Sequence, residues 1–272
     1  MQKVILITGA TDGIGLATAK KLVEQGHRIL IHGRNKEKLD RVEKELIELS
    51  EDAQVEPYLA DLSSLSDAEA LAKSVVEKHS KLDVLINNAG VLKTPQPTTQ
   101  DGLDVRFVVN TFSPYLLTKK LLPVLGTEGR VVNLSSAAQS PVNQDAMLGK
   151  VKIVDDLNVY AQSKLAITMW SHALANTLKD NGPVFIALNP GSLLATKMVK
   201  EGFGMAGHDI GIGADVLVRA ALSDEFADAS GQYFDNDAGG FASPHHDADN
   251  LEKSTALVQI IEKILSEKVQ SR

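Results

Sequence analysis

A short apolar run and a glycine-rich turn open the chain: Val4-Ile5-Leu6-Ile7-Thr8-Gly9-Ala10-Thr11-Asp12-Gly13-Ile14-Gly15. Residues 4–8 are mostly apolar and β-branched and stop at a glycine, which predicts a buried strand. The glycines allow a tight turn in which a pyrophosphate can approach the N-terminus of the next helix, where free N–H groups and the helix dipole favour an anion. The stretch therefore predicts a dinucleotide site, with an ordinary glycine-rich turn as the alternative. The predicted cofactor-binding residues of this turn are Gly9, Thr11, Asp12, Gly13, Ile14 and Gly15.

Strands and helices alternate along the rest of the chain. Further strands are predicted at 28–32, 55–59, 84–86, 131–134 and 184–188, with a short candidate at 231–234. Helices are predicted at 14–25, 36–49, 67–79, 116–125, 159–178 and 257–269. Such alternation implies parallel strands joined by right-handed helical crossovers. We therefore predict a Rossmann-type three-layer α/β sandwich, a mostly seven-stranded parallel sheet with helices on both faces, and we expect the last helix to pack on the sheet or on a partner.

The composition is that of a globular protein. The 272 residues are 43% hydrophobic and 23% charged, and no linker-like stretch divides them, so a single domain over residues 1–272 is expected. The absence of cysteine excludes disulfides, thiolate zinc sites and a thiol nucleophile. A formal charge of -7 argues against a nucleic-acid partner. The first strand leaves no room for a signal peptide and no apolar run is long enough to span a bilayer, so a cytoplasmic protein is expected.

The end of the second predicted strand indicates which dinucleotide binds. It reads His32-Gly33-Arg34-Asn35, without a carboxylate. A site for NAD normally offers an acidic residue to the ribose hydroxyl at this point, whereas the 2′-phosphate of NADP favours an arginine. Arg34, with Asn35 beside it, therefore predicts NADP(H) rather than NAD(H). The alternative is a solvent-exposed arginine at a strand end.

Tyr160 and Lys164 lie four residues apart in a predicted helix, so both side chains project from the same helix face. A free phenol titrates near pH ~10 and is a poor proton donor or acceptor at neutrality. A neighbouring ammonium favours the phenolate and lowers this pKa. Alone, the spacing is more typical of a solvated helix face, and the rest of the chain has to decide between the two interpretations.

With these motifs in their order, nearly the whole chain resembles the short-chain dehydrogenase/reductase family. The resemblance implies hydride transfer between a nicotinamide and a carbonyl or secondary alcohol of a small or medium, fairly apolar substrate. It implies that Tyr160 gives or takes the proton, that Lys164 lowers the Tyr160 pKa and holds the nicotinamide ribose, and that Ser136 positions the reacting oxygen. The matching features are the Thr8–Gly15 pattern, Asn87-Asn88-Ala89-Gly90, Asn110, Ser136, the Tyr160/Lys164 pair and Pro190-Gly191.

The same resemblance implies further cofactor contacts. Asp61 and Leu62 would contact the adenine, although an Asp can also cap the following turn. Asn88, Ala89 and Gly90 would line the adenosine side, where small residues permit a close backbone approach. Pro190, Gly191 and Thr196 would lie near the nicotinamide amide, with Thr196 one residue later than is common in the family.

Asn110 is predicted to take part in proton transfer. Pro114 has no N–H, so in a helix the carbonyl of Asn110 would lose its partner and could hold a water. In the resembled family the corresponding Asn anchors a water in a relay to the active-site lysine. A simple kink near the start of a helix is the alternative.

Two stretches depart from the common family pattern. The stretch 137–157 is long and resembles the branch of retinol dehydrogenase-like and WW-domain oxidoreductase-like enzymes, without their membrane anchor or WW modules. The stretch 202–213 is glycine-rich, which predicts a mobile substrate lid over residues 191–213.

Other functions remain open on the sequence. A non-catalytic NAD(P)-binding sensor or scaffold would tend to lose the serine, tyrosine or lysine, and a sugar-nucleotide epimerase would need a larger C-terminal domain. An NAD-dependent enzyme of the same fold is a further alternative. We interpret His245-His246-Asp247 as a polar loop and predict no metal site. Relatives often form dimers or tetramers through helices equivalent to 116–125 and 159–178, whose apolar faces could instead serve the core.

Overall fold

The computed structural model of the chain describes residues 1–269, with the side chain of Phe203 left out. An eight-stranded sheet has the order β3-β2-β1-β4-β5-β6-β7-β8. The first seven strands are parallel, which confirms the predicted fold class, and β8 adds an antiparallel edge next to β7. The strands are β1 (Val4–Ile7), β2 (Arg28–Gly33), β3 (Gln54–Leu59), β4 (Val84–Asn87), β5 (Arg130–Leu134), β6 (Val184–Asn189), β7 (Tyr233–Asp235) and β8 (Gly240–Ala242).

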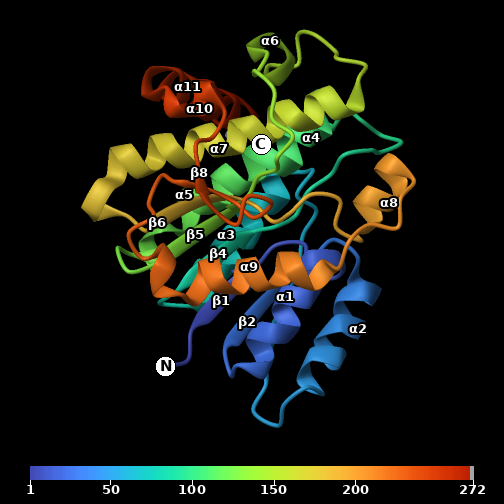
Figure 1. Ribbon diagram of the computed structural model, residues 1–272, viewed down its shortest axis with the longest axis vertical. Coiled ribbons are helices and arrows are strands. Elements are labelled where there is room, and N and C mark those ends of the chain that lie inside the picture. The colour runs from blue at the N-terminus through green and yellow to red at the C-terminus, as the bar shows by residue number, and fades with distance from the viewer. Residues whose placement is uncertain (270–272) are drawn as a thin grey trace.

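Helices cover both faces of the sheet (Figure 1). One face carries α1 (Gly13–Glu24), α2 (Lys36–Ile47) and α9 (Ile210–Leu222), and the other carries α3 (Leu65–Lys78), α5 (Ser113–Leu125) and α7 (Asp156–Leu178). The helix α11 (Leu251–Val269) forms an outer layer over α7 and α3. Short helices complete the chain: α4 (Val105–Phe107), α6 (Gln144–Met147), α8 (Lys197–Phe203) and α10 (His246–Asp249), with a π-helical turn at Val108–Phe112 and 3₁₀ turns at Lys179–Asn181 and Asp224–Phe226.

The apolar strands are buried because both faces of the sheet are covered. Ile5 and Ile7 of β1 pack into the core under α1, α2 and α9, whereas Leu6 between them packs into the core under α3, α5 and α7. Successive strand residues point to opposite faces, so a strand covered on both sides reads as a continuous apolar run. That is the pattern from which the buried first strand was predicted.

The helix α9 was not predicted, and it changes the extent of the lid. Residues 210–213 form its first turn, and α9 packs along α1. A Cβ on Gly213 would lie 2.6 Å from Leu194 Cδ1 and 3.3 Å from Ile14 Cγ2, so glycine permits the close approach here. The glycine-rich end of the predicted lid is therefore a packed helix start, which leaves residues 191–209 outside regular core elements.

The last helix packs mainly on other helices rather than directly on the sheet. The side chains of Leu257, Ile261, Ile264 and Leu265 are buried in the core that α7 and α3 share. The hydroxyl of Tyr115 on α5 donates to Glu262 at 2.7 Å. Within residues 1–269, no helix combines the length and apolar character needed to cross a bilayer.

Candidate active site

Most of the predicted site residues gather at the carboxyl edge of the sheet. The turns that follow β1, β4, β5 and β6 meet there, because these strands are parallel neighbours. The helix α7 passes beside this edge, where the Lys164 ammonium donates to the carbonyl of Leu134 at the end of β5. Ligands of open α/β sheets bind at such an edge.

The glycine turn is locked against the loop after β4. The Thr8 hydroxyl accepts the N–H groups of Asn88 and Ala89 at 3.0 and 3.1 Å. The Asn88 amide donates to the carbonyls of Thr8 and Gly9 at 2.8 and 3.0 Å. A Cβ on Gly15 would lie 2.4 Å from the Gly9 carbonyl oxygen, so only glycine fits there. The first turn of α1 is thereby drawn close to the strand end.

The N-terminus of α1 opens toward the segment after β6. Asp12 caps α1 by accepting the N–H of Gly13 at 2.8 Å, and Gly13 has a φ of +57°. A Cβ on Gly13 would lie 3.7 Å from Thr196 Cγ2, so Thr196 lies beside the glycine turn. The Thr196 hydroxyl accepts the N–H of Val199 at 3.2 Å and caps α8.

His32 links the carboxyl ends of β1, β2 and β3 through hydrogen bonds, and no sequence pattern had indicated this role. Its Nδ1 accepts the N–H of Gly9 at 3.1 Å, so the proton is on Nε2, 3.0 Å from the carbonyl oxygen of Ala60. Burial lowers the pKa of His32 to about 4, and the ring is therefore neutral at pH 7. A single histidine at a strand end has no spacing pattern that would have revealed this bridge.

Arg34 directly follows the carboxyl end of β2, beside the glycine turn. It is exposed and follows Gly33, where a Cβ would lie 2.4 Å from Thr11 Cγ2 of the glycine turn. The side chain of the next residue, Asn35, caps α2 by accepting the N–H of Lys38 at 2.9 Å. The guanidinium can thus reach a group bound near the glycine turn, whereas the Asn35 oxygen is already engaged.

Asp61 and Leu62 follow β3. The Asp61 carboxylate accepts the N–H of Ser63 at 2.9 Å and its hydroxyl at 2.8 Å, which is the turn-capping alternative. Leu62 is buried, and its carbonyl accepts the hydroxyl of Ser113 at 2.7 Å. The predicted contact with an adenine stays a prediction.

Tyr160, Ser136 and Lys164 come together at the edge. The side chain of Ser136 lies close enough to the Tyr160 hydroxyl to influence its pKa. The Lys164 ammonium lies 5.7 Å from the centroid of the Tyr160 ring and donates to the carbonyl oxygen of Leu134 at 2.6 Å. All three side chains belong to α7 or to the turn after β5, which α7 flanks.

The pKa of Tyr160 differs from the expectation. Burial raises the pKa of its phenol, and the hydrogen bond from Ser136 acts in the opposite direction without outweighing burial. Burial also lowers the pKa of Lys164 to about 8. The expected lowering of the Tyr160 pKa is therefore not produced by this chain's residues alone, because Lys164 donates to a backbone carbonyl and desolvation disfavours both charges.

The two serines after β5 have different surroundings. Ser135 is buried, and its hydroxyl bonds to the Lys164 carbonyl at 3.0 Å and to Thr168 at 2.7 Å. The carbonyl of Ser136 accepts hydrogen bonds from Gln139 Nε2 at 3.0 Å and from the Tyr233 hydroxyl at 3.2 Å. Tyr233 and Gln139 were not predicted, because neither belongs to a motif.

Asn110 connects the π-helical turn to α7. Its side chain accepts the N–H of Val91 at 2.8 Å and donates to the carbonyl of Val91 at 3.0 Å and to the hydroxyl of Ser163 at 2.9 Å. Pro114 lies in the first turn of α5, where a missing N–H is tolerated. A water on the Asn110 carbonyl stays a prediction.

Gly90 is the point where two of the predicted catalytic side chains and the predicted lid converge. A Cβ on Gly90 would lie 3.6 Å from each of three atoms: Asn110 Oδ1, Lys164 Nζ and Met198 Cε. Met198 belongs to α8, so this short helix reaches over the site. Two further apolar residues follow Met198 in this segment: Met205 is exposed, and the side chain of Phe203 lies outside the described residues.

The turn after β6 is held by acidic and amide side chains. Gly191 has a φ of +118°, and its N–H donates to Asn189 Oδ1 at 3.3 Å. The Asn236 amide donates to the carbonyl of Pro190 at 3.0 Å, and Asp237 accepts the N–H of Ser192 at 2.8 Å. This bracing fixes the start of the 191–209 segment.

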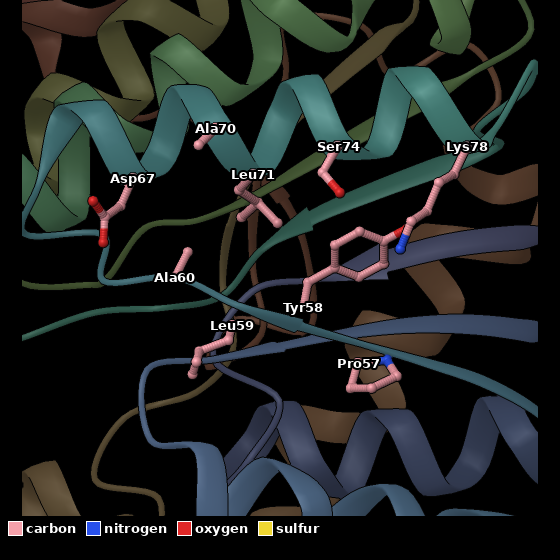
Figure 2. Close-up of a pocket in the computed structure, with 9 residues that line it drawn as sticks. All are labelled: Pro57, Tyr58, Leu59, Ala60, Asp67, Ala70, Leu71, Ser74 and Lys78. Carbon is pink, nitrogen blue, oxygen red and sulfur yellow. The ribbon is translucent and has the colours of Figure 1, made fainter.

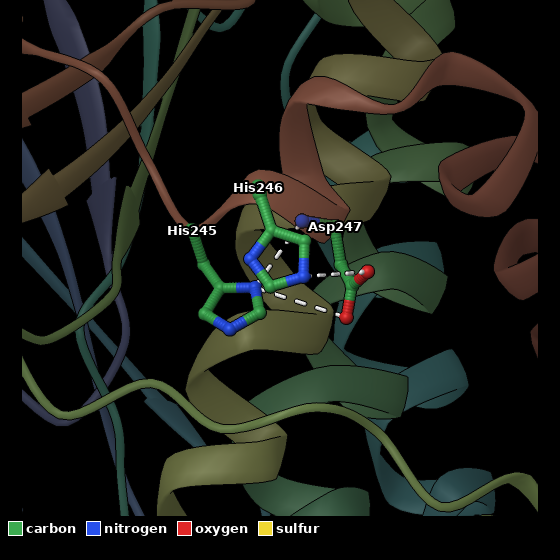
Figure 3. Close-up of side chains that lie close together, drawn as sticks. All are labelled: His245, His246 and Asp247. Carbon is green, nitrogen blue, oxygen red and sulfur yellow. Dashed lines mark hydrogen bonds and ion pairs between the residues drawn. The ribbon is translucent and has the colours of Figure 1, made fainter.

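His245, His246 and Asp247 lie side by side at the start of α10 (Figure 3). His245 Nδ1 accepts the N–H of Asp247 at 3.2 Å and thereby caps α10, and the Lys253 ammonium pairs with the Asp247 carboxylate. These contacts engage atoms that a cation would need. The cluster therefore forms the start of a helix rather than the expected loop.

A hollow of about 270 Å³ lies between the edge strand β3 and α3 (Figure 2). The Lys78 ammonium lies 5.1 Å from the Tyr58 ring centroid on its wall. The hollow contains none of the predicted catalytic residues.

Known proteins resemble the chain in sequence and in fold. A family model described as short chain dehydrogenase matches residues 3–205. Retinol dehydrogenase 13 of Homo sapiens is 31% identical over 251 residues, which cover 86% of this chain and 76% of that protein. An uncharacterized protein from Mycobacterium Paratuberculosis has a crystal structure with a TM-score of 0.81 at 27% identity, covering 97% of this chain and 93% of that one. A metagenomic short-chain oxidoreductase in complex with NADP gives a TM-score of 0.61 at 28% identity, covering 80% and 90%.

Proposed function

The chain belongs to the short-chain dehydrogenase family, and on this premise we propose that it transfers a hydride between NADP(H) and a carbonyl or secondary alcohol. The observation that carries the proposal is the proximity of the Ser136 side chain to the Tyr160 hydroxyl, with the Lys164 ammonium 5.7 Å from the centroid of the Tyr160 ring. A substrate that is small or medium and fairly apolar fits this proposal.

Each of the proposed catalytic residues has its own role in the reaction. The Tyr160 hydroxyl gives its proton to the substrate oxygen in reduction and takes it back in oxidation, while the Ser136 hydroxyl donates a hydrogen bond to the same oxygen. The Lys164 ammonium favours the phenolate form of Tyr160. Asn110 holds the loop at Val91 and joins it to the catalytic helix through Ser163. When bound, the nicotinamide supplies or accepts the hydride.

The glycine turn fits the pyrophosphate of such a cofactor. The close approach at Gly15 and the N–H groups in the first turn of α1, apart from that of Gly13, favour an anion there. Gly9, Thr11, Asp12, Gly13 and Ile14 would line this site, with Asp61, Leu62, Asn88, Ala89 and Gly90 on the adenosine side and Pro190, Gly191 and Thr196 near the nicotinamide.

The exposed Arg34 supports NADP(H) over NAD(H), and a similar oxidoreductase was solved with NADP. Replacing Arg34 with Asp should raise the KM for NADPH by about 10- to 100-fold, because a charged hydrogen bond contributes about 1.5–3 kcal/mol and the new carboxylate repels the 2′-phosphate. The change Arg41→Asp, further along α2, is the matched control. A wild type that prefers NADH would overturn the assignment of NADP(H).

Residues 191–209 are proposed to act as a lid over the substrate. The N–H of Ala195 donates to the carbonyl of His208 and the N–H of His208 to the carbonyl of Leu193, both at 2.7 Å. These bonds close the base of the segment, and α8 between them brings Met198 over Gly90.

The test of the function is a panel of aliphatic and aromatic aldehydes and ketones, followed by the absorbance of NADPH. The change Tyr160→Phe should lower kcat by about 10²–10⁴-fold and leave the Kd of NADPH unchanged, because it removes only the proton donor. Tyr58→Phe, at the hollow between β3 and α3, is the control and should retain full turnover. Turnover that survives Tyr160→Phe would contradict the proposal, and a non-catalytic sensor would show no turnover with any member of the panel.

A further inference from the structure

Arg106 is a buried cation that no motif in the sequence singled out. Only 2% of its surface is exposed. Its guanidinium contacts Asp104 through both oxygens, Nε to Oδ1 at 2.8 Å and Nη2 to Oδ2 at 2.6 Å, and Nη1 donates to Asp156. A buried charge is costly unless partners of opposite charge and good geometry surround it. Two carboxylates from separate segments meet that need.

The two carboxylates lie at the starts of the two helical segments that carry the proposed catalytic residues. Asp104 caps α4, and α4 runs directly into the π-helical turn, which places Asn110 one turn after Arg106. Asp156 is the first residue of α7, with Tyr160 one turn later and Lys164 two turns later. The guanidinium therefore ties the start of one segment to the start of the other.

A second set of bonds joins the same segments one turn further on. Asn110 donates to the Ser163 hydroxyl at 2.9 Å, and Thr111 donates to the Ser163 carbonyl at 2.9 Å. The Ser163 hydroxyl in turn donates to the carbonyl of Tyr160 at 2.7 Å. A π-helical turn has an extra residue and is intrinsically less stable than an α-helix, so its register depends on such external contacts.

We propose that Arg106 is a positioning residue for the active site. Its bridge between Asp104 and Asp156 sets the position of α7 against the π-helical turn, and through it the distance of the Tyr160 hydroxyl from Ser136 and from the substrate oxygen. This inference rests on the proposed function. A displacement of about 1 Å at a reacting group can lower a rate by about 10²-fold, so a helix shift too small to unfold the protein suffices.

The test compares Arg106→Lys and Asp156→Asn with the wild type, using NADPH and the carbonyl of the panel that gives the highest turnover. Lysine keeps the charge but lacks the planar fork that contacts two carboxylates at once. Each change should lower kcat by about 10- to 100-fold and leave the Kd of NADPH within about twofold, since Arg106 is not placed in the nucleotide site. The change Arg219→Lys, which weakens the exposed ion pair between Arg219 of α9 and Glu225 of the following 3₁₀ turn, is the matched control and should leave kcat unchanged.

Folding and positioning are separated by measuring kcat well below the melting temperature of each variant, per folded molecule as judged by circular dichroism. A variant that melts earlier but keeps the wild-type kcat would overturn the proposal, because Arg106 would then only stabilise the fold. The double variant should be no slower than Asp156→Asn alone, and fully additive losses would overturn the route through Asp156. A wild type without turnover refutes the proposed function itself and, with it, this role for Arg106.

Discussion

Lys164 is a buried lysine whose protonation state changes close to physiological pH. Its pKa is lowered to about 8 from 10.5 by burial. The ammonium form, which favours the Tyr160 phenolate, is therefore complete well below pH 8 and is lost as the pH rises through that value. We expect kcat/KM for NADPH, which reports the free enzyme, to fall as the pH is raised past about 8.

The variant Lys164→Arg provides the comparison for this pH profile. A guanidinium stays charged at every accessible pH, so the fall near pH 8 should vanish even if the absolute rate is lower. An unchanged fall in this variant would assign the titration to another group. The profile of kcat/KM for NADPH, measured from pH 6 to about 10, makes the distinction.

The Tyr233 hydroxyl, at the start of β7 and two strands away from β5, holds the backbone carbonyl of Ser136. Burial raises the pKa of its phenol, so the hydroxyl remains a hydrogen-bond donor to the Ser136 carbonyl across the working pH range. The change Tyr233→Phe removes this one bond, worth about 0.5–1.5 kcal/mol, and should lower kcat by about 2- to 10-fold without unfolding the protein. Steady-state kinetics and thermal melting check this, and an unaltered kcat would mean that Gln139 alone suffices to hold the loop.

At the scale of the elements, the 191–209 segment is held by backbone hydrogen bonds between its two ends, whereas residues 204–206 in its middle are exposed. Gly204 and Gly207 have positive φ values, and Lys197 and Lys200 on α8 are exposed. If the segment closes over bound cofactor, NADP(H) should slow tryptic cleavage after these two lysines by about 10-fold, because closure makes the required local opening rarer. Cleavage at the exposed Lys152, outside the lid, should not change and serves as the internal control.

Equal cleavage rates after Lys197 and Lys200 with and without NADP(H) would contradict the proposal that residues 191–209 close over the cofactor.

The helix α9, which begins at Ile210, sets the limit of this segment, since its first turn packs against Leu194 and Ile14. Its glycines permit close packing, whereas the same residue type was taken as a sign of mobility in the sequence. The glycine content of a stretch thus does not distinguish a hinge from a tight helix contact.

For the whole molecule, the outer helix α11 bears on how the chain associates. Nearly all of α7 from Val159 to Ala175 is buried, and α11 and α10 pack along it. The apolar faces of α5 and α7 therefore serve the core, which was the alternative to pairing between subunits. We expect sedimentation equilibrium to give the mass of a single chain, 29.2 kDa, in place of the homodimer or homotetramer that the family suggested.

The variant Ile261→Asp tests whether α11 prevents subunits from pairing through α7. A buried charge at this position should loosen α11 and expose α7. A mass that rises in this variant, with a wild type that stays at one chain, supports the shielding role of α11. An association of the wild type through α7 itself would refute it.

Short-range patterns were enough to predict the sheet and the order of its main elements along the chain, whereas the resemblance to a known family indicated most of the residues that meet at its carboxyl edge. Short apolar runs, the glycine spacing of residues 9–15 and the four-residue interval from Tyr160 to Lys164 are local, and local geometry maps them directly onto strands, turns and helix faces. Fold and family followed from them.

Only the tertiary structure revealed the contacts between residues that are distant in the chain. His32 bridging Gly9 and Ala60, Tyr233 on the carbonyl of Ser136, and Arg106 on Asp156 each join segments that no sequence interval relates. The raised pKa of Tyr160 belongs to the same group, because it depends on how deeply the phenol is buried rather than on which residue lies one turn away. Burial and long-range pairing are properties of the packed chain, and a linear pattern does not contain them.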